Sequence, residues 1–293
     1  MKNFRILLCT LLICSCRPAH PYLEDERSFI AGFYEFNEIM ANWKTVTIDD
    51  ADFLRVDLYI PKAHLLADKY STDKSVAELY KSCCIKHNDY SSKDIRHDTD
   101  IPKEIREIIP NHAGDCCYPV SDFVSVSITA NKQWDDAHPE GSSLDGISHF
   151  AGISPNQFFL NSYKVYDPTQ DSLSIFFNNV FFKNELYPNH VLRMWQMCYP
   201  IDKKVVELNA EDLKLLGPGE MAMPGGMGFE EPDMLYYSPD VSFVVYDDND
   251  RFDFEDNLCS IFIPIERDGV ERSLTVTLTD ENGTDYSTTV TIE

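Results

Sequence analysis

The strongest constraint on the fold is an alternation of apolar and hydroxyl-bearing residues at the C-terminal end. Residues 274–279 alternate leucine or valine with threonine, and the alternation returns in 286–292 after a turn-forming run at 280–285. A period of two places alternate side chains on opposite faces of a strand, whereas a helix repeats every 3.6 residues. Two such runs joined by Asp, Asn and Gly predict an antiparallel hairpin.

The same period recurs further upstream. Residues 51–60 predict a half-buried strand that ends at Pro61, and residues 124–129 predict another strand. Further strands are expected at 158–165, 173–182, 242–246 and 259–265. The fold class is therefore mainly β, with antiparallel sheets.

Residues 61–119 have a different character. Two short helices are expected, at 75–80 and at 102–109, separated by a polar loop rich in Ser, Asp and His. We interpret this stretch as irregular, partly helical and tied by disulfides.

The N-terminal sixteen residues indicate export. Lys2 and Arg5 precede an apolar run at 6–13, which is too short to span a bilayer and ends in Ile13-Cys14-Ser15-Cys16. This pattern resembles a bacterial lipoprotein signal peptide with its lipobox. The resemblance implies removal of residues 1–15 and a lipid on Cys16 that attaches the protein to a membrane. Plain secretion and a cytosolic N-terminus are the alternatives.

A polar tether with two prolines is expected at 16–28. In lipoproteins of the Bacteroidetes, an acidic cluster after the lipidated cysteine is associated with surface display, and Glu24-Asp25-Glu26 resembles such a cluster but comes late. We therefore expect an outer-membrane lipoprotein of the cell envelope. The side of the membrane, periplasmic or outward, stays open.

Two further resemblances concern the body of the protein. The C-terminal hairpin resembles the last two strands of bacterial immunoglobulin-like modules, which implies an antiparallel β-sandwich over residues 120–293, after a disulfide-containing region at 29–119. Residues 128–145 are similar to a His-Pro-x-Gly-Ser-Ser-Leu-x-Asp stretch of Bacteroidetes lipoproteins of unknown function, although Gly146 stands where the acid is expected. This second resemblance implies no catalytic residue.

Composition limits the partners. The chain has 49 acidic and 25 basic residues, a formal net charge of −24, which repels nucleic acid and anionic membrane surfaces. The alternative is that the acidity serves solubility alone. With 43% hydrophobic and 12% aromatic residues, the chain has enough apolar material for a folded body.

Six cysteines remain beyond the signal and Cys16, and in an exported chain they are disulfide candidates. We expect the 83/84 pair to be bridged to the 116/117 pair, and Cys198 to Cys259. His87 and His112 beside the two vicinal pairs leave a zinc site as the alternative. The six candidates are Cys83, Cys84, Cys116, Cys117, Cys198 and Cys259.

Two loops contain potential metal ligands. A carboxylate-rich loop could hold Ca²⁺ and otherwise forms a solvated acidic turn; its candidate ligands are Asp247, Asp248, Asp250 and Asp253. A glycine-rich loop carries thioethers that could bind Cu(I) and otherwise forms a surface loop; its candidate ligands are Met221, Met223 and Met227. No cofactor is expected apart from possible calcium.

The function expected from these features is that of a non-catalytic binding module for a glycan or an envelope protein. No nucleophile elbow, phosphate-binding loop or His-Glu-x-x-His pair nominates an active site. A hydrolase with paired carboxylates, which no motif identifies, and a metal-binding envelope protein are the alternatives. Trp43, Trp134 and Trp195 could stack on sugar rings or fill a core.

Overall fold

The computed structural model describes residues 30–68, 71–89, 116–161, 199–217, 220–221 and 257–292. Several expectations lie outside these ranges: the signal expected at 1–15, the tether expected at 16–28, the helix expected at 102–109 and the strands expected at 173–182 and 242–246, together with Cys16 and Cys198. The acidic residues at 247–256, Met223 and Met227 lie outside them as well.

Strands dominate the described residues. Among the helices within these ranges, none is long and apolar enough to cross a membrane. The expectation of a mainly β protein with antiparallel sheets is confirmed. The elements are β1 (Ile30–Glu35), β2 (Met40–Ile48), β3 (Ala51–Tyr59), β4 (His64–Asp68), α2 (Lys74–Lys86), β5 (Cys116–Pro119), β6 (Phe123–Ala130), β7 (His149–Ser154), α4 (Asn156–Leu160), β8 (Tyr199–Lys204), a 3₁₀ turn (Val205–Glu207), β9 (Glu220–Met221), β10 (Asn257–Pro264), β11 (Arg272–Asp280) and β12 (Asp285–Ile292).

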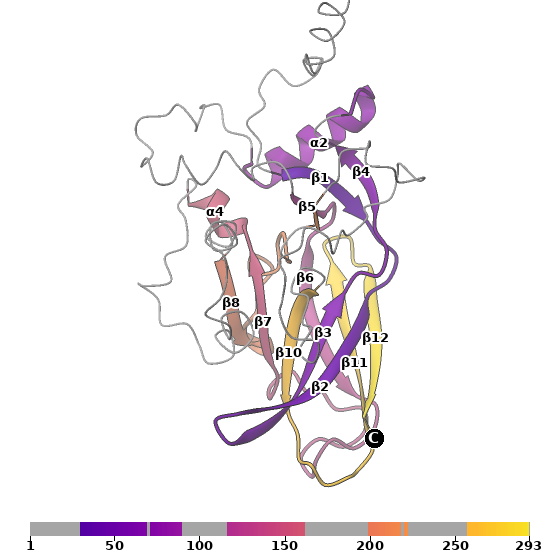
Figure 1. Cartoon of the computed structure of the whole chain (residues 1–293), viewed down its shortest axis with the longest axis vertical. Coiled ribbons are helices and arrows are strands. Elements are labelled where there is room, and N and C mark those ends of the chain that lie inside the picture. Colours follow the sequence, from indigo (N-terminus) through magenta and orange to yellow (C-terminus); the bar gives the residue numbers. More distant parts are fainter. Residues whose placement is uncertain are drawn as a thin grey trace, which may run out of the picture.

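Two antiparallel sheets share the main core. One has the order β2-β3-β10-β7-β8 and the other the order β12-β11-β6 (Figure 1). Alternate residues of both sheets enter a single hydrophobic cluster, so each sheet buries one face against the other. Its central members include Leu54, Val56, Phe150, Ile261, Ile128, Leu274, Val276 and Val290.

The C-terminal hairpin forms as its alternation predicts. Leu274 pairs with Val290 and Leu278 with Tyr286 across β11 and β12. In the turn, the Asp280 carboxylate accepts hydrogen bonds from the N–H groups of Asn282 and Thr284 at 2.9 and 2.8 Å. Gly283 has a φ of 79°, a conformation that glycine adopts without steric cost.

A third sheet lies at the upper end of the molecule in Figure 1, where α2 packs against it. Its order is β4-β1-β5-β9, with β1 and β5 parallel. The face under α2 forms a second hydrophobic cluster that contains Ile30, Phe33, Tyr80 and Tyr118. The Tyr80 hydroxyl donates to the Ile30 carbonyl at 2.5 Å, which fixes the helix over the sheet.

Two local expectations are changed by the structure. The helix expected at 75–80 forms but is longer, as α2 (Lys74–Lys86). Asp73 fixes its start by accepting from the Ser75 and Val76 N–H groups. Residues 158–160 are helical, in α4, where a strand was expected. A strand would separate Phe158 and Phe159 onto opposite faces, whereas both are buried and both belong to the cluster under α2.

No disulfide joins the described cysteine side chains to one another. The expected bridges through Cys116 and Cys198 involve side chains outside the described set and stay predictions. Cys117 packs in the main core, whereas Cys83 and Cys84 pack in the separate cluster under α2. The strand turns Cys117 away from the helix, and a disulfide needs Cα atoms closer than about 7 Å with converging side chains. Cys83 and Cys259 are buried thiols.

Replacing Gly32 of β1 by Ala should destabilise the protein by about 1 to 3 kcal/mol. A Cβ at this position would lie 2.6 Å from the Ala67 backbone oxygen, which cannot move without breaking the β1–β4 pairing. Urea unfolding measures the change. Gly146→Ala is the control, because a Cβ there meets nothing within 4 Å; equal effects of the two substitutions would contradict this packing.

Candidate functional site: the polar junction at the end of helix α2

The junction begins at the C-terminal end of α2, where the sequence stops the helix. Asn88 adopts a left-handed φ of 56°, and its N–H donates to Ile85 O while the Asp89 N–H donates to Cys84 O at 2.9 Å. These two bonds form a Schellman motif. The Asp89 carboxylate then accepts from the Ile30 N–H of β1 at 2.9 Å. The helix end, with Lys86 and His87, is thereby held in one position.

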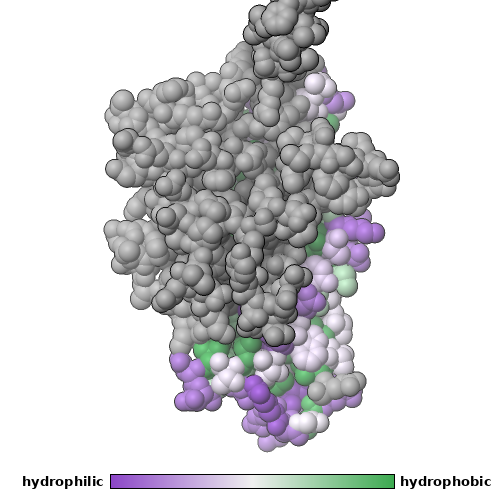
Figure 2. Space-filling model, in the orientation of Figure 1, coloured by the Kyte–Doolittle hydropathy of each residue, from purple (hydrophilic) through white to green (hydrophobic). Residues whose placement is uncertain are grey.

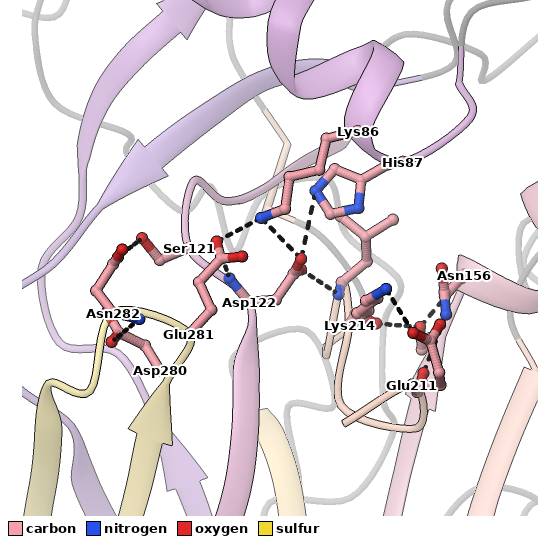
Figure 3. A network of polar contacts seen from close by, with 12 residues as sticks. Lys86, His87, Ser121, Asp122, Asn156, Glu211, Lys214, Asp280, Glu281 and Asn282 are labelled. Atoms are coloured by element: carbon pink, nitrogen blue, oxygen red, sulfur yellow. Dashed lines mark hydrogen bonds and ion pairs between the residues drawn. The ribbon is translucent and has the colours of Figure 1, made fainter. Parts of the chain in front are cut away.

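Asp122 is the centre of the junction and directly precedes β6. Its carboxylate lies 2.9 Å from the Lys86 Nζ and accepts a hydrogen bond from the Leu215 N–H at 3.1 Å (Figure 3). The carboxylate is buried, whereas the Lys86 side chain is about one third exposed. One side chain therefore links three segments that are distant in sequence.

The turn between β11 and β12 supplies the second carboxylate. Glu281 Oε1 lies 2.5 Å from the Lys86 Nζ and also accepts from the Asp122 N–H at 3.3 Å. In return, the Glu281 N–H donates to the Asp122 carbonyl at 2.8 Å. Asn282 adds a hydrogen bond from its side-chain amide to the Ser121 hydroxyl at 2.9 Å. The tip of the hairpin is thus fastened to the start of β6.

A loop at 209–217 completes the junction from the other side. Leu215 is buried and has a φ of 49°, a conformation that costs a non-glycine residue about 1 to 2 kcal/mol. Asp122 accepts its N–H and so compensates part of this strain. Beside it, Lys214 pairs with Glu211 at 2.6 Å, and Asn156 donates to the Glu211 carbonyl at 3.0 Å (Figure 3).

The charged groups of the junction are arranged so that they stabilise one another. Burial acts against the Lys86 cation, but the hydrogen bonds and charges of Asp122 and Glu281 prevail and raise the pKa of Lys86. The ammonium is therefore held in its charged form between two carboxylates. Such an arrangement, in which the cation and the two carboxylates contact one another, fixes the position of α2 against the sheets.

His87 is the exception in this cluster. It is buried, its ring stacks on Phe33, and neither ring nitrogen has a hydrogen-bond partner among the described residues. Its Nε2 lies 3.7 Å from the Asp122 Oδ2. Burial lowers the pKa of His87 to about 4, against the opposing attraction of Asp122. The ring is therefore neutral at pH 7.

A second polar cluster lies on the face of the five-stranded sheet that points away from the main core. The Arg55 Nε donates to Asp57 Oδ1 at 2.7 Å, and the Ser260 hydroxyl donates to the same oxygen. All three are buried, so β3 is covered on both faces and its expected half-buried character is wrong. Further along the same face, His149 pairs with Asp202.

Residues 128–145 form the end of β6 and the loop that follows it. Trp134 and Leu144 enter the main core, and the Trp134 indole N–H donates to the Pro264 carbonyl at 2.9 Å. Asp145 accepts the Ile128 N–H at 2.7 Å, and Asp135 pairs with His138 at 2.8 Å. Packing and hydrogen bonding therefore account for the conformation of this loop.

The two described tryptophans differ in how exposed their side chains are. Trp134 is 2% exposed, whereas Trp43, on the edge strand β2, is 42% exposed. Trp195 lies outside the described residues.

The metal ligands expected from the sequence are not brought together where the structure describes them. Within the described ranges, no group of three or more His, Cys, Asp or Glu side chains is arranged to hold a metal ion. The backbone of Met221 lies in β9, next to Cys116 of β5.

Sequence reasoning missed Lys86, Asp122 and Glu281. His87 was considered only as a zinc ligand. The available local signals were the helix end at Lys86 and the turn at 280–285, and neither indicates that the two meet.

No protein-family model matches the chain, and searches of curated proteins and of solved structures also find no match. The functional argument therefore rests on the residues of this chain.

Asp122→Ala should destabilise the protein by about 2 to 4 kcal/mol, because it leaves the Leu215 N–H without its acceptor and Lys86 with a single carboxylate. Asp122→Asn keeps an acceptor and should cost less. Glu271→Ala, which removes an exposed pair with Lys132, is the control and should cost less than about 1 kcal/mol. Chemical unfolding measures all three, and equal losses for Asp122→Ala and Glu271→Ala would contradict the central role of Asp122.

Acidification should destabilise the protein through His87. The unfolded histidine takes up a proton near pH 6.5, whereas the folded one does so only near pH 4, so the unfolded state binds more protons between these values. The contribution of His87 to stability is complete above pH 6.5 and is lost as the pH falls to 4, by roughly 3 kcal/mol.

The measurement is the difference in unfolding free energy between pH 7 and pH 4.5. His87→Phe should flatten this dependence, and Ile85→Ala, at an exposed residue of the same helix that does not titrate, should leave it unchanged. An identical pH dependence in His87→Phe and the native protein would refute the assignment.

Proposed function

We propose that this chain is a lipid-anchored protein of the cell envelope that acts as a non-catalytic binding module for a glycan or protein partner, built on an immunoglobulin-like β-sandwich. The proposal joins two features. One is the strand order of the two sheets that share the main core, and the other is an exposed tryptophan on an edge strand.

The strand order supports the immunoglobulin-like assignment. A constant-type immunoglobulin domain has strands A, B, E and D in one sheet and C, F and G in the other. If β2, β3, β6, β7, β10, β11 and β12 are strands A to G in chain order, the observed orders β2-β3-β10-β7 and β12-β11-β6 reproduce both sheets. All neighbours in them are antiparallel. β8 is an addition beside strand D.

The remaining elements are insertions in this scheme. β4, α2 and β5 lie between strands B and C, β1 precedes strand A, and β9 lies between strands D and E. Together they form the four-stranded sheet and its covering helix. The junction at Asp122 joins this added layer to strand C and to the turn between strands F and G. The insertion is thus an integral part of the proposed sandwich.

The binding role rests on Trp43. Tryptophan is enriched among residues that dominate binding energy, and it is amphipathic enough to stack on sugars. Trp43 is 42% exposed on β2, an edge strand, and Met40, on the opposite face of the same strand, is 44% exposed. Figure 2 shows hydrophobic residues interspersed with hydrophilic ones at the lower end of the visible face. An exposed tryptophan on a rigid strand is a suitable anchor for a partner.

Lipidation is tested by metabolic labelling with a clickable fatty acid in a bacterial host that processes lipoproteins. The full chain should take up the label and partition with membranes, and Cys16→Ala should lose the label because the acceptor thiol is gone. Cys9→Ala, which alters a cysteine of the proposed signal, is the control. Label on Cys16→Ala equal to that on the native chain would exclude lipidation at Cys16.

Binding is tested by presenting the full chain to envelope extract and to a glycan array. Trp43→Ala should weaken capture of the partner about tenfold or more, as expected for an interface anchor. Ile85→Ala, at an exposed residue of α2, is the control and should leave capture unchanged. Capture that is indifferent to Trp43→Ala would contradict the proposed role of this residue.

A further inference from the structure

The outer face of the three-stranded sheet carries an array of hydroxyl groups. The register of β6, β11 and β12 aligns the residues of this face in rows, such as Thr129 with Thr275 and Thr289, and Ser127 with Thr277 and Ser287. Three hydroxyls come from β6, four from β11 and three from β12. They are Ser125, Ser127, Thr129, Ser273, Thr275, Thr277, Thr279, Ser287, Thr289 and Thr291.

This face is open and almost uncharged. The hydroxyl residues of β6 and β12 are exposed, those at 275, 277 and 279 on the central strand are half-buried, and Ser273 at its end is buried. The single charged residue in the same rows is Asp285, at one corner. A chain with 49 acidic residues therefore leaves these rows neutral along nearly their whole length.

The hydroxyls are ordered but not saturated. Thr277 and Ser287 share a hydrogen bond at 2.8 Å. Thr275 bonds Thr289 at 3.0 Å and also the Asn131 side chain at 3.0 and 3.2 Å, so its own capacity is used, and Thr279 donates to Asp285 at 2.7 Å. A hydroxyl has one donor and two acceptor sites, so a single cross-strand bond leaves capacity for a ligand. Threonine is also stiff at χ1, and little side-chain entropy is lost when a ligand binds.

The chemistry of the face selects a partner class. Serine and threonine are under-represented among the anchors of protein interfaces, which argues against a protein partner here. A neutral face offers no cations for phosphate groups. Repeated hydroxyls on a flat scaffold instead complement a ligand that presents many hydroxyls and no charge.

We propose that the hydroxyl face binds a neutral polysaccharide. The proposal rests on the binding function proposed above and names its ligand class. Hydroxyls repeat about every 6.8 Å along a strand and about every 4.8 Å between strands, so an extended chain can form several hydrogen bonds at once. β12 also contacts β2, the strand that carries Trp43. An aromatic stacking residue thus lies on a strand that borders the hydroxyl face.

The test is native affinity electrophoresis of the full chain in detergent, through gels that contain hydroxyethylcellulose, glucomannan, dextran or pullulan, with anionic alginate as a charged comparison. At least one neutral polymer should retard the protein, and alginate should not. Thr129→Val/Thr277→Val/Thr289→Val keeps side-chain shape and strand preference but removes one hydroxyl from each strand. It should weaken retardation about tenfold or more.

Two further variants keep the result interpretable. Thr45→Val/Thr288→Val, at strand positions outside the hydroxyl face, is the matched control and should migrate as the native chain does. Ser127→Ala/Ser287→Ala serves as a second removal of hydroxyls if the triple variant does not fold, and it should also weaken retardation. Thermal unfolding confirms that each variant is folded.

The proposal is overturned if no neutral polymer retards the protein, if alginate retards it equally, or if folded variants without these hydroxyls bind as the native chain does. If Trp43→Ala is the only variant that loses polymer binding, the proposed role of the hydroxyl face is also rejected, while the proposed binding function stands. If the protein captures an envelope protein through Trp43 but no polysaccharide retards it, the hydroxyl-face proposal is likewise rejected and the proposed binding function stands.

Discussion

The buried carboxylate of Asp122 joins the parts of this protein that would otherwise be independent. It contacts the Lys86 ammonium at the end of α2 and accepts the strained N–H of Leu215, and its backbone is bonded to Glu281 in the turn of the last hairpin. A buried charge is stable only when it is paired and hydrogen-bonded, so the four segments must be in place together. The helix, the first strand of the three-stranded sheet and the hairpin tip therefore depend on one another.

This dependence shapes the functional interpretation. The junction holds the inserted layer rigidly on one end of the two sheets, while the edge strand β2 and the outer face of the three-stranded sheet stay accessible. A rigid scaffold lowers the entropy lost on binding. The proposed use of Trp43 and of the hydroxyl face relies on that rigidity. The neutral ring of His87 adds an acid-sensitive element beside the same carboxylate.

Features that depend on local interactions were predicted from the sequence, whereas those that depend on contacts between distant residues were not. The terminal hairpin and the strands near 51–60, 124–129 and 259–265 were predicted because alternation reports directly on strand faces. The prediction failed at Phe158 and Phe159, where packing under α2 overrides the apolar run. The sequence also did not show that Cys117 faces a different core from Cys83 and Cys84, because vicinal cysteines do not reveal which core each one faces. The buried Arg55–Asp57 pair was hidden, since charged residues normally mark an exposed face.

The sequence by itself determined the mainly β character, the position of the last hairpin and the two faces of its strands, because backbone geometry makes these properties local. It also contained the hydroxyl residues of the outer face, although not their alignment across three strands. Only the tertiary structure decided that β3 pairs with β10, more than 190 residues later, as well as with its neighbour β2, and that Lys86 meets Glu281 from 195 residues away. Such contacts are selected by the joint burial of apolar faces and by the pairing of buried charge, and no local pattern encodes either.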